Sequence, residues 1–135
     1  MFNQIRLIVN NRRFIMIYFK RVFIATMMGV VSGFICVGFA STGGSLSLPL
    51  FLNIFTGRVL IGFVIGISGL KIHWAINGPL MGLIVGIPAG FGGMLAEVEG
   101  FTPLSMFLAT VVMGILYGFL IEFVTSVLFK AKQKQ

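Results

Sequence analysis

The sequence predicts an all-α fold, a polytopic membrane protein that forms a bundle of four transmembrane helices. Two features of the composition lead to this class: 58% of the 135 residues are hydrophobic, and only 10% are charged. A soluble domain is nearer half apolar and about a quarter charged, and a chain this short could not hide so much apolar surface in one core. The composition therefore excludes a soluble globular enzyme, a disordered protein and a coiled coil.

The basic residues gather at the two ends of the chain. Ten basic and three acidic residues give a net charge of +7. Basic residues that flank apolar runs mark the cytoplasmic side of a membrane protein and are attracted to anionic lipid. We therefore expect the lipid bilayer, and no nucleic acid, as a partner. The basic residues of the two ends are Arg6, Arg12, Arg13, Lys20, Arg21, Lys130, Lys132 and Lys134.

Residues 1–21 mix short apolar runs with basic residues. Neither apolar run approaches the roughly 20 residues needed to cross a bilayer. The segment is therefore predicted to be amphipathic and to lie at the cytoplasmic surface of the membrane, held there by aromatic and basic side chains.

Four apolar runs follow this segment. Residues 22–41 carry no charge and form the first predicted span. A cleaved secretory signal peptide is the alternative, although the apolar region is long for one and more spans follow. The other spans are predicted at about residues 53–71, 75–95 and 104–129, before a basic tail at 130–135.

Two connections are less regular. A glycine and serine cluster after the first span breaks helical continuity, and Pro49 can start a new helix. The apolar stretch 48–55 can lie flat in the interface, re-enter the membrane or begin the second span. Farther on, Lys71 marks a membrane surface and Asn77 supplies turn chemistry, so a hairpin tip is predicted near residues 71–77.

The topology follows from the charges. Because both ends are basic, both termini are predicted to be cytoplasmic and the number of spans to be even. Four spans place Lys71 inside and the acidic loop at residues 96–103 outside, whereas three spans would put one basic end outside. The predicted location is the cell (inner) membrane, which the chain crosses several times.

Glycine recurs at four-residue spacing in every predicted span. Residues four apart share a helix face, and small residues on one face let two backbones approach closely in lipid. These faces are interpreted as helix-packing surfaces within the chain or, alternatively, between subunits. The glycines are Gly29, Gly33, Gly62, Gly66, Gly78, Gly82, Gly86, Gly90, Gly114 and Gly118.

Pro88 lies within the glycine row of the third span. It removes a backbone donor and frees the carbonyl of Ile84. A kink is predicted, and a polar cavity lined by that carbonyl is the alternative if water or substrate reaches it.

Glu122 is the one acidic residue inside a predicted span, and it shares a face with Gly114 and Gly118. An ionisable residue in a membrane is a functional hypothesis by default. Glu122 is predicted either to bind a proton or cation in a transport path, or to form an ion pair that fixes helix packing. Lys71 or His73 is the expected partner of that pair.

Two further ionisable residues complete the candidate set. Arg58 falls in the outer third of the second span, from which its long side chain can snorkel to the surface. His73 is expected to anchor the hairpin at the interface beside Trp74, and a proton relay is the alternative.

Nothing in the sequence predicts an enzyme. Metalloprotease, hydrolase, P-loop and dinucleotide-binding motifs are absent, so no catalytic residue and no cofactor is predicted. One His and one Cys, Cys36, cannot supply a metal cluster.

Two classes of function remain. The first is permeation or transport of a small solute or ion, for which four spans enclose so little volume that we expect a homo-oligomer. The second is a structural or accessory subunit that packs on another membrane protein through the glycine faces. Membrane permeabilisation of the holin type is a third alternative.

Overall fold

The computed structural model describes residues 2–68, 70 and 72–130, and all of its regular elements are helical. Four α-helices follow one another: α1 (Phe2–Ser41), α2 (Leu48–Ile67), α3 (Trp74–Met94) and α4 (Pro103–Phe123). The last is continued by one π-helical turn, η1 (Val124–Leu128). Each of the four is long and apolar enough to cross a membrane, which agrees with the predicted number of spans.

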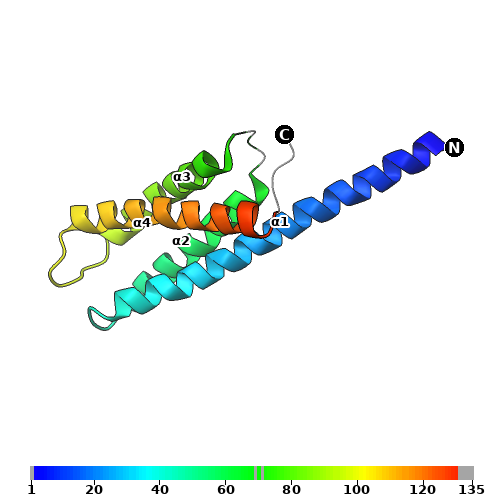
Figure 1. Cartoon of the computed structure of the whole chain (residues 1–135). Coiled ribbons are helices and arrows are strands. Elements are labelled where there is room, and N and C mark those ends of the chain that lie inside the picture. The colour runs from blue at the N-terminus through cyan, green and yellow to red at the C-terminus, as the bar shows by residue number, and fades with distance from the viewer. Residues whose placement is uncertain (1, 69, 71, 131–135) are drawn as a thin grey trace.

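Helix α1 joins two segments that the sequence pattern separates. The basic segment 1–21 and the first span form one continuous helix from Phe2 to Ser41. The first half of α1 projects beyond the other helices as a separate arm (Figure 1). Residues 4–13 of this arm are all exposed, because no other helix covers them.

Helix α2 begins earlier than its predicted boundary near residue 53. Pro49 stands in the first turn of α2, where its missing N–H is not needed. The stretch 48–55 is therefore the start of the second helix, which is the third of the three arrangements considered for it. A Gly43–Gly44 turn precedes it, with Gly44 at φ 140°, a backbone conformation that favours glycine.

The connection between α2 and α3 is shorter than the predicted hairpin tip. It ends at His73, whose Nδ1 accepts a hydrogen bond from the Ala75 backbone N–H and so caps α3. Asn77, which was predicted to lie at the tip, is inside α3 and fully buried. Lys71 lies outside the described residues.

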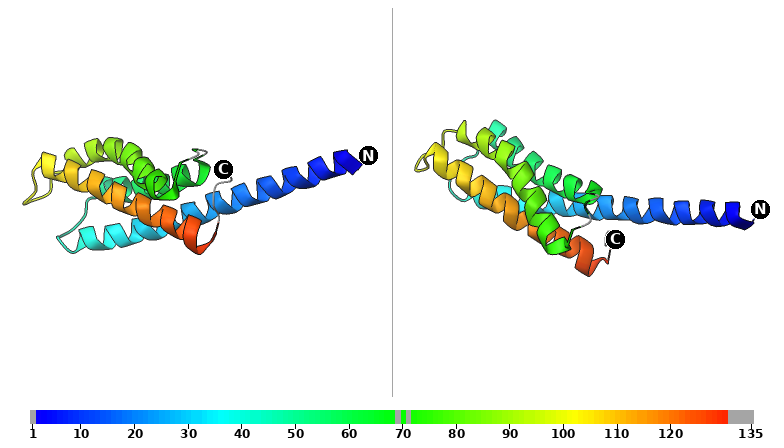
Figure 2. Two further views of the ribbon diagram at one scale, coloured as in Figure 1. Left: turned by 45° about the horizontal axis from the view of Figure 1, so that its top comes forward. Right: turned by 90° about the horizontal axis from the view of Figure 1, so that it is seen from above.

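Helices α3 and α4 tolerate their prolines. Helix α3 continues through Pro88 to Met94, and Figure 2 shows it as a curved helix. Helix α4 starts with Pro103 after Thr102, whose hydroxyl accepts a hydrogen bond from the Ser105 N–H. The first turn of α4 is therefore defined by a cap and a proline together.

The helices pack most extensively as two antiparallel pairs, α1 with α2 and α3 with α4. A small apolar core joins the pairs; its fully or nearly buried members are Ala25, Ile61, Ile65, Met81, Val85 and Ile121. Within the α3–α4 pair the backbones touch, since a methyl group on Gly82 would overlap the carbonyl oxygen of Gly114. Most large apolar side chains elsewhere are exposed, as expected for helices that face lipid.

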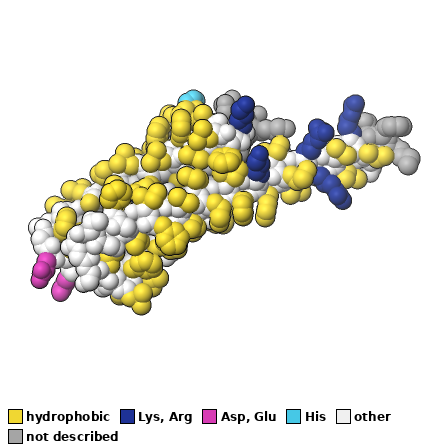
Figure 3. All heavy atoms as spheres, turned by 60° about the horizontal axis from the view of Figure 1, so that its bottom comes forward, with side chains coloured by type: hydrophobic (Ala, Val, Ile, Leu, Met, Phe, Trp, Pro, Cys, Tyr) yellow, Lys and Arg dark blue, Asp and Glu magenta, His cyan; other side chains and the backbone are white. Residues whose placement is uncertain are grey.

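The two ends of the bundle carry opposite charges. One end of the bundle, which we call the basic end, is the end from which the arm of α1 projects (Figure 1). Helix α2 ends and α3 begins there, and η1 also ends there. The opposite, acidic end holds connections 42–47 and 95–102. Figure 3 shows Lys and Arg side chains toward the basic end and acidic side chains at the other, where Glu97 and Glu99 lie in connection 95–102.

Candidate functional site: two buried arginines between α1, α2 and α4

The first buried charge is Arg21 of α1. Its Nη2 lies 2.8 Å from Oε1 and 2.9 Å from Oε2 of Glu122 in α4. Ser126 of η1 bridges the pair: its hydroxyl accepts from Arg21 Nη1 at 3.2 Å and donates to Glu122 Oε1 at 2.7 Å. Both charged residues are 2% exposed. This is a neutralised ion pair removed from solvent, with its hydrogen bonds supplied by neighbouring helices.

Helix α2 completes the surroundings of this pair. Its Ile65 carbonyl accepts from Arg21 Nη2 at 3.4 Å. One turn nearer the arm, the Tyr18 hydroxyl donates to the carbonyl of Ile67 at 2.8 Å. These carbonyls belong to the last turn of α2, where backbone acceptors have no partner within the helix. The end of α2 is therefore satisfied by α1 side chains.

The local sequence explains why α1 reaches Glu122. A methyl group on Gly66 would lie 2.7 Å from the Cα of Val22, so only a glycine there permits this approach of α1 to α2. Ser126 follows Glu122 by four residues, which places both side chains on one face of the helix end.

The second buried charge is Arg58, in the middle of α2 and 3% exposed. Its Nη2 lies 3.6 Å from the Cys36 sulfur, as a weak hydrogen bond. Its Cζ lies 5.2 Å from the centre of the Tyr117 ring of α4, within cation–π range. Arg58 thus stands among a thiol, an aromatic face and apolar neighbours.

The direction of the Arg58 side chain follows from its backbone contacts. A methyl group on Gly29 would lie 2.7 Å from the carbonyl oxygen of Arg58, so Gly29 of α1 lies directly beside the backbone of Arg58 in α2. Cys36 is seven residues farther along α1, roughly 10 Å at 1.5 Å per residue. The guanidinium therefore extends toward the acidic end, as expected for snorkelling, but it remains buried and does not reach the surface.

No carboxylate of the described residues forms an ion pair with Arg58. The chain has three acidic residues. Glu122 is held by Arg21, whereas Glu97 and Glu99 lie beyond the end of α3. In addition, Arg58 Nε is buried and has no hydrogen-bond acceptor in the described structure. A buried guanidinium in this condition is costly unless an anion or an acceptor joins it.

Two other polar contacts join the helices. Ser68, just after α2, donates to the Asn77 side-chain oxygen at 2.9 Å, and Asn77 is fully buried. The Asn53 side chain of α2 donates to the carbonyl of Ala89 in α3 at 3.3 Å, one residue beyond Pro88. Polar side chains therefore cross the α2–α3 interface near both of its ends.

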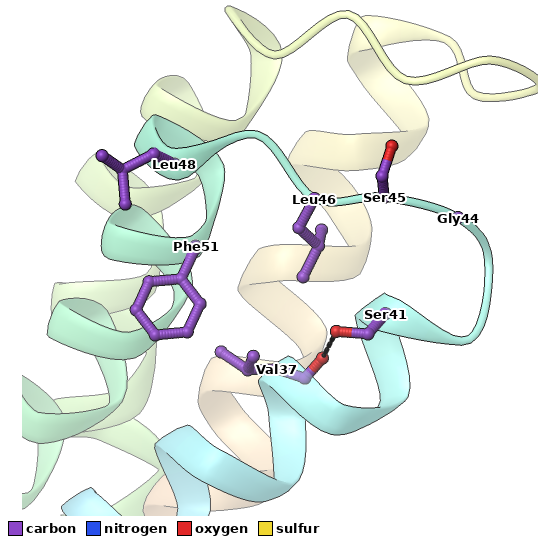
Figure 4. A pocket seen from close by; sticks show the side chains of 7 residues that line it. All are labelled: Val37, Ser41, Gly44, Ser45, Leu46, Leu48 and Phe51. Carbon is purple, nitrogen blue, oxygen red and sulfur yellow. Dashed lines mark hydrogen bonds between the residues drawn. The ribbon is translucent and has the colours of Figure 1, made fainter.

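An open groove of about 500 Å³ lies at the acidic end, between the end of α1 and the start of α2. In Figure 4 Val37, Leu46 and Phe51 surround it, and the Ser41 hydroxyl is turned back to donate to the Val37 carbonyl. Gly44, Ser45 and Leu48 complete the lining. Val37 is next in sequence to Cys36, the thiol that Arg58 contacts.

The structure rearranges the predicted site. Glu122 is paired with Arg21 instead of His73, because His73 caps α3 while Arg21 enters the bundle from α1. The other expected partner, Lys71, lies outside the described residues. From the sequence, Arg21 counts among the basic residues at the N-terminal end because it borders the first apolar run. The structure shows that its side chain faces the other helices.

Three partners of the arginines were also missed: Cys36, Tyr117 and Ser126. For two of them, the spacing of residues in the sequence was a usable indication. Cys36 lies seven residues after Gly29, nearly two turns at 3.6 residues per turn, so it shares the helix face of that glycine. Ser126 lies four residues after Glu122. Within the described part of the chain, no group of three His, Cys, Asp or Glu residues could hold a metal.

Comparison with protein-family models, with curated proteins and with solved structures finds no match to this chain.

Proposed function

We propose that the protein is a multi-pass protein of the cell (inner) membrane that lets a small solute or ion cross, as a homo-oligomer and without enzymatic chemistry. Its basic end faces the cytoplasm and its acidic end faces outward. The separation of charge between the two ends supports this orientation, since basic residues are retained on the cytoplasmic side.

The observation that carries the proposal is the line of buried polar groups between α1, α2 and α4. Arg21, Glu122 and Arg58 are all at most 3% exposed in helices that are otherwise apolar. Ionisable residues within spans are expensive and commonly mark substrate or ion pathways. The contacts of these residues extend from the Ile65 carbonyl in the last turn of α2 to Cys36 near the acidic end.

The two arginines do not support the proposal equally. The contact of Arg21 Nη2 with both carboxylate oxygens favours an ion pair that fixes helix packing over a cation-binding role for Glu122. Arg58 carries the functional interpretation instead, because its charge has no carboxylate partner among the described residues. His73 caps α3, and in this proposal it anchors the hairpin at the membrane surface.

The second candidate is an accessory membrane subunit, favoured by the exposed arm of α1. Several large apolar side chains on this arm are uncovered, with Phe19 70% exposed. Such a surface can be covered by lipid or by a partner protein. The glycine rows support this candidate less, since the rows of α3 and α4 contact each other within the chain: a methyl group on Gly78 would overlap the Gly118 carbonyl oxygen.

One experiment separates the two candidates. The full chain is purified in mild detergent, its native mass is measured, and it is reconstituted into liposomes for flux assays with small anions, cations and neutral solutes. A permeation protein forms a defined oligomer and gives flux that protein-free liposomes lack. A monomer that is inert in liposomes and recovers a stoichiometric membrane partner from the native membrane contradicts the proposal.

A further inference from the structure

The surroundings of Arg58 favour an anion over a cation as a ligand. Among the described residues, the Arg58 guanidinium contacts a thiol and an aromatic ring. Neither supplies a full negative charge, and the buried Nε has no acceptor in the described structure. A cation is repelled from this position by the guanidinium itself, whereas an anion gains charge-assisted hydrogen bonds.

The charge of that ligand is limited by the surroundings. In a low-dielectric interior an unneutralised charge is costly in either sign. One guanidinium can neutralise one negative charge, and Arg21 is already occupied by Glu122. A doubly charged anion would leave the site with an excess negative charge. The site therefore fits a singly charged anion.

The route to Arg58 also restricts the ligand. The side chain points toward Cys36, whose neighbour Val37 lines the groove at the acidic end. Phe51 lines the groove and stacks on Phe55, one turn nearer Arg58 along α2, with ring centres 6.1 Å apart. An anion that passes this apolar surface must shed much of its water, and weakly hydrated anions do so at lower cost.

We infer that Arg58, with Cys36 and Tyr117, forms a binding site for a small, singly charged, weakly hydrated anion that arrives from the groove at the acidic end. The inference rests on the proposed function and names its substrate class. Nitrate fits this description best, chloride is more strongly hydrated, and a short carboxylate shares the single charge but is the most strongly hydrated of the three.

The test is a binding measurement on the purified full chain. Its thermal unfolding midpoint is recorded at constant ionic strength while sodium sulfate is replaced by sodium nitrate, chloride or acetate. A ligand that binds the folded state raises the midpoint in a saturable manner. With the midpoint in sulfate as the baseline, we expect nitrate to half-saturate the shift at a lower concentration than chloride. A response to acetate alone contradicts the preference for weakly hydrated anions and overturns the inference.

Two variants locate the response. Arg58→Gln is expected to raise the half-saturating anion concentration by about tenfold or more, the loss typical of a hydrogen bond to a charged group. Arg13→Gln removes the same charge from the exposed arm of α1 and should respond like the parent chain. A wild-type chain with no saturable response to any of the three anions overturns the inference, whatever the variants do. So does an equal response in Arg58→Gln.

Flux measured with the same proteins in liposomes separates failure of the permeation proposal from failure of the anion site. Anion binding without flux of any solute overturns permeation but retains the binding site. Flux that is the same in Arg58→Gln as in the parent chain, together with no saturable anion binding, retains permeation and overturns the anion site.

Discussion

Arg21 and Arg58 place the same side chain in two different electrostatic settings. Both lie between α1, α2 and α4, and both are almost completely buried. Arg21 binds a carboxylate through two hydrogen bonds and shares a serine with it. Arg58 contacts a thiol sulfur and an aromatic face. Burial alone therefore does not distinguish the two arginines, whereas a carboxylate partner among the described residues does.

The largest expected effect comes from breaking the neutralised pair. Glu122→Gln leaves the Arg21 guanidinium buried without its counter-charge, so we expect a loss of about 3 kcal/mol in unfolding free energy. Reversible unfolding in mixed micelles measures it. A double variant, Arg21→Met with Glu122→Met, removes both charges and should recover most of that loss. A double variant as unstable as Glu122→Gln would show that the pair is not the cause.

The next effect tests the backbone contacts that support each arginine. Gly66→Ala places a methyl group against Val22 beside the Arg21 pair, and Gly29→Ala places one against the carbonyl of Arg58. Each is expected to lower unfolding free energy by about 2 kcal/mol, the range of overpacking. The same micelle unfolding measures both losses, and only Gly29→Ala should also weaken the anion response.

Gly38→Ala is the matched control for these two variants. A methyl group on Gly38 meets nothing within 4 Å, so the alanine should stabilise the helix by about 0.5 kcal/mol. Equal destabilisation by all three alanines would mean that loss of glycine itself, and not the helix contact, is responsible.

A smaller effect is expected at the serine that bridges the Arg21 pair. Ser126→Ala removes one acceptor for Arg21 and one donor to Glu122, while the ion pair itself remains. The expected loss is about 1 kcal/mol, typical of a hydrogen bond. Unfolding in the same micelles measures it, and a loss as large as that of Glu122→Gln would assign the stability of the site to the serine.

The sequence was sufficient to predict an all-α chain with long apolar helices, because long apolar runs have few alternatives to a helix of membrane-spanning length. It also predicted the number of long helices and the separation of charged ends. Helix boundaries were less accurate: the start of α2 depends on Pro49 in its first turn, and the apolar stretch after it is compatible with several conformations.

The site could be predicted only in part. Glu122 and Arg58 were candidates because a charge inside an apolar run is visible in a single sequence. Their partners were not, because contacts between α1 and α4 join residues about a hundred positions apart. Arg21 shows the limit best, since its place at the border of an apolar run is compatible with either a lipid-facing or a buried side chain.

The most direct test compares one substitution at the two arginines. The unfolding free energies of Arg21→Met and Arg58→Met are measured side by side in mixed micelles. Arg21→Met leaves Glu122 buried and unpaired, so it should lose about 3 kcal/mol. Arg58→Met leaves no carboxylate unpaired and exchanges a buried charge for an apolar side chain, so its change should stay within about 1 kcal/mol. Equal losses for the two variants would contradict the claim that one arginine is neutralised by the chain and the other is not.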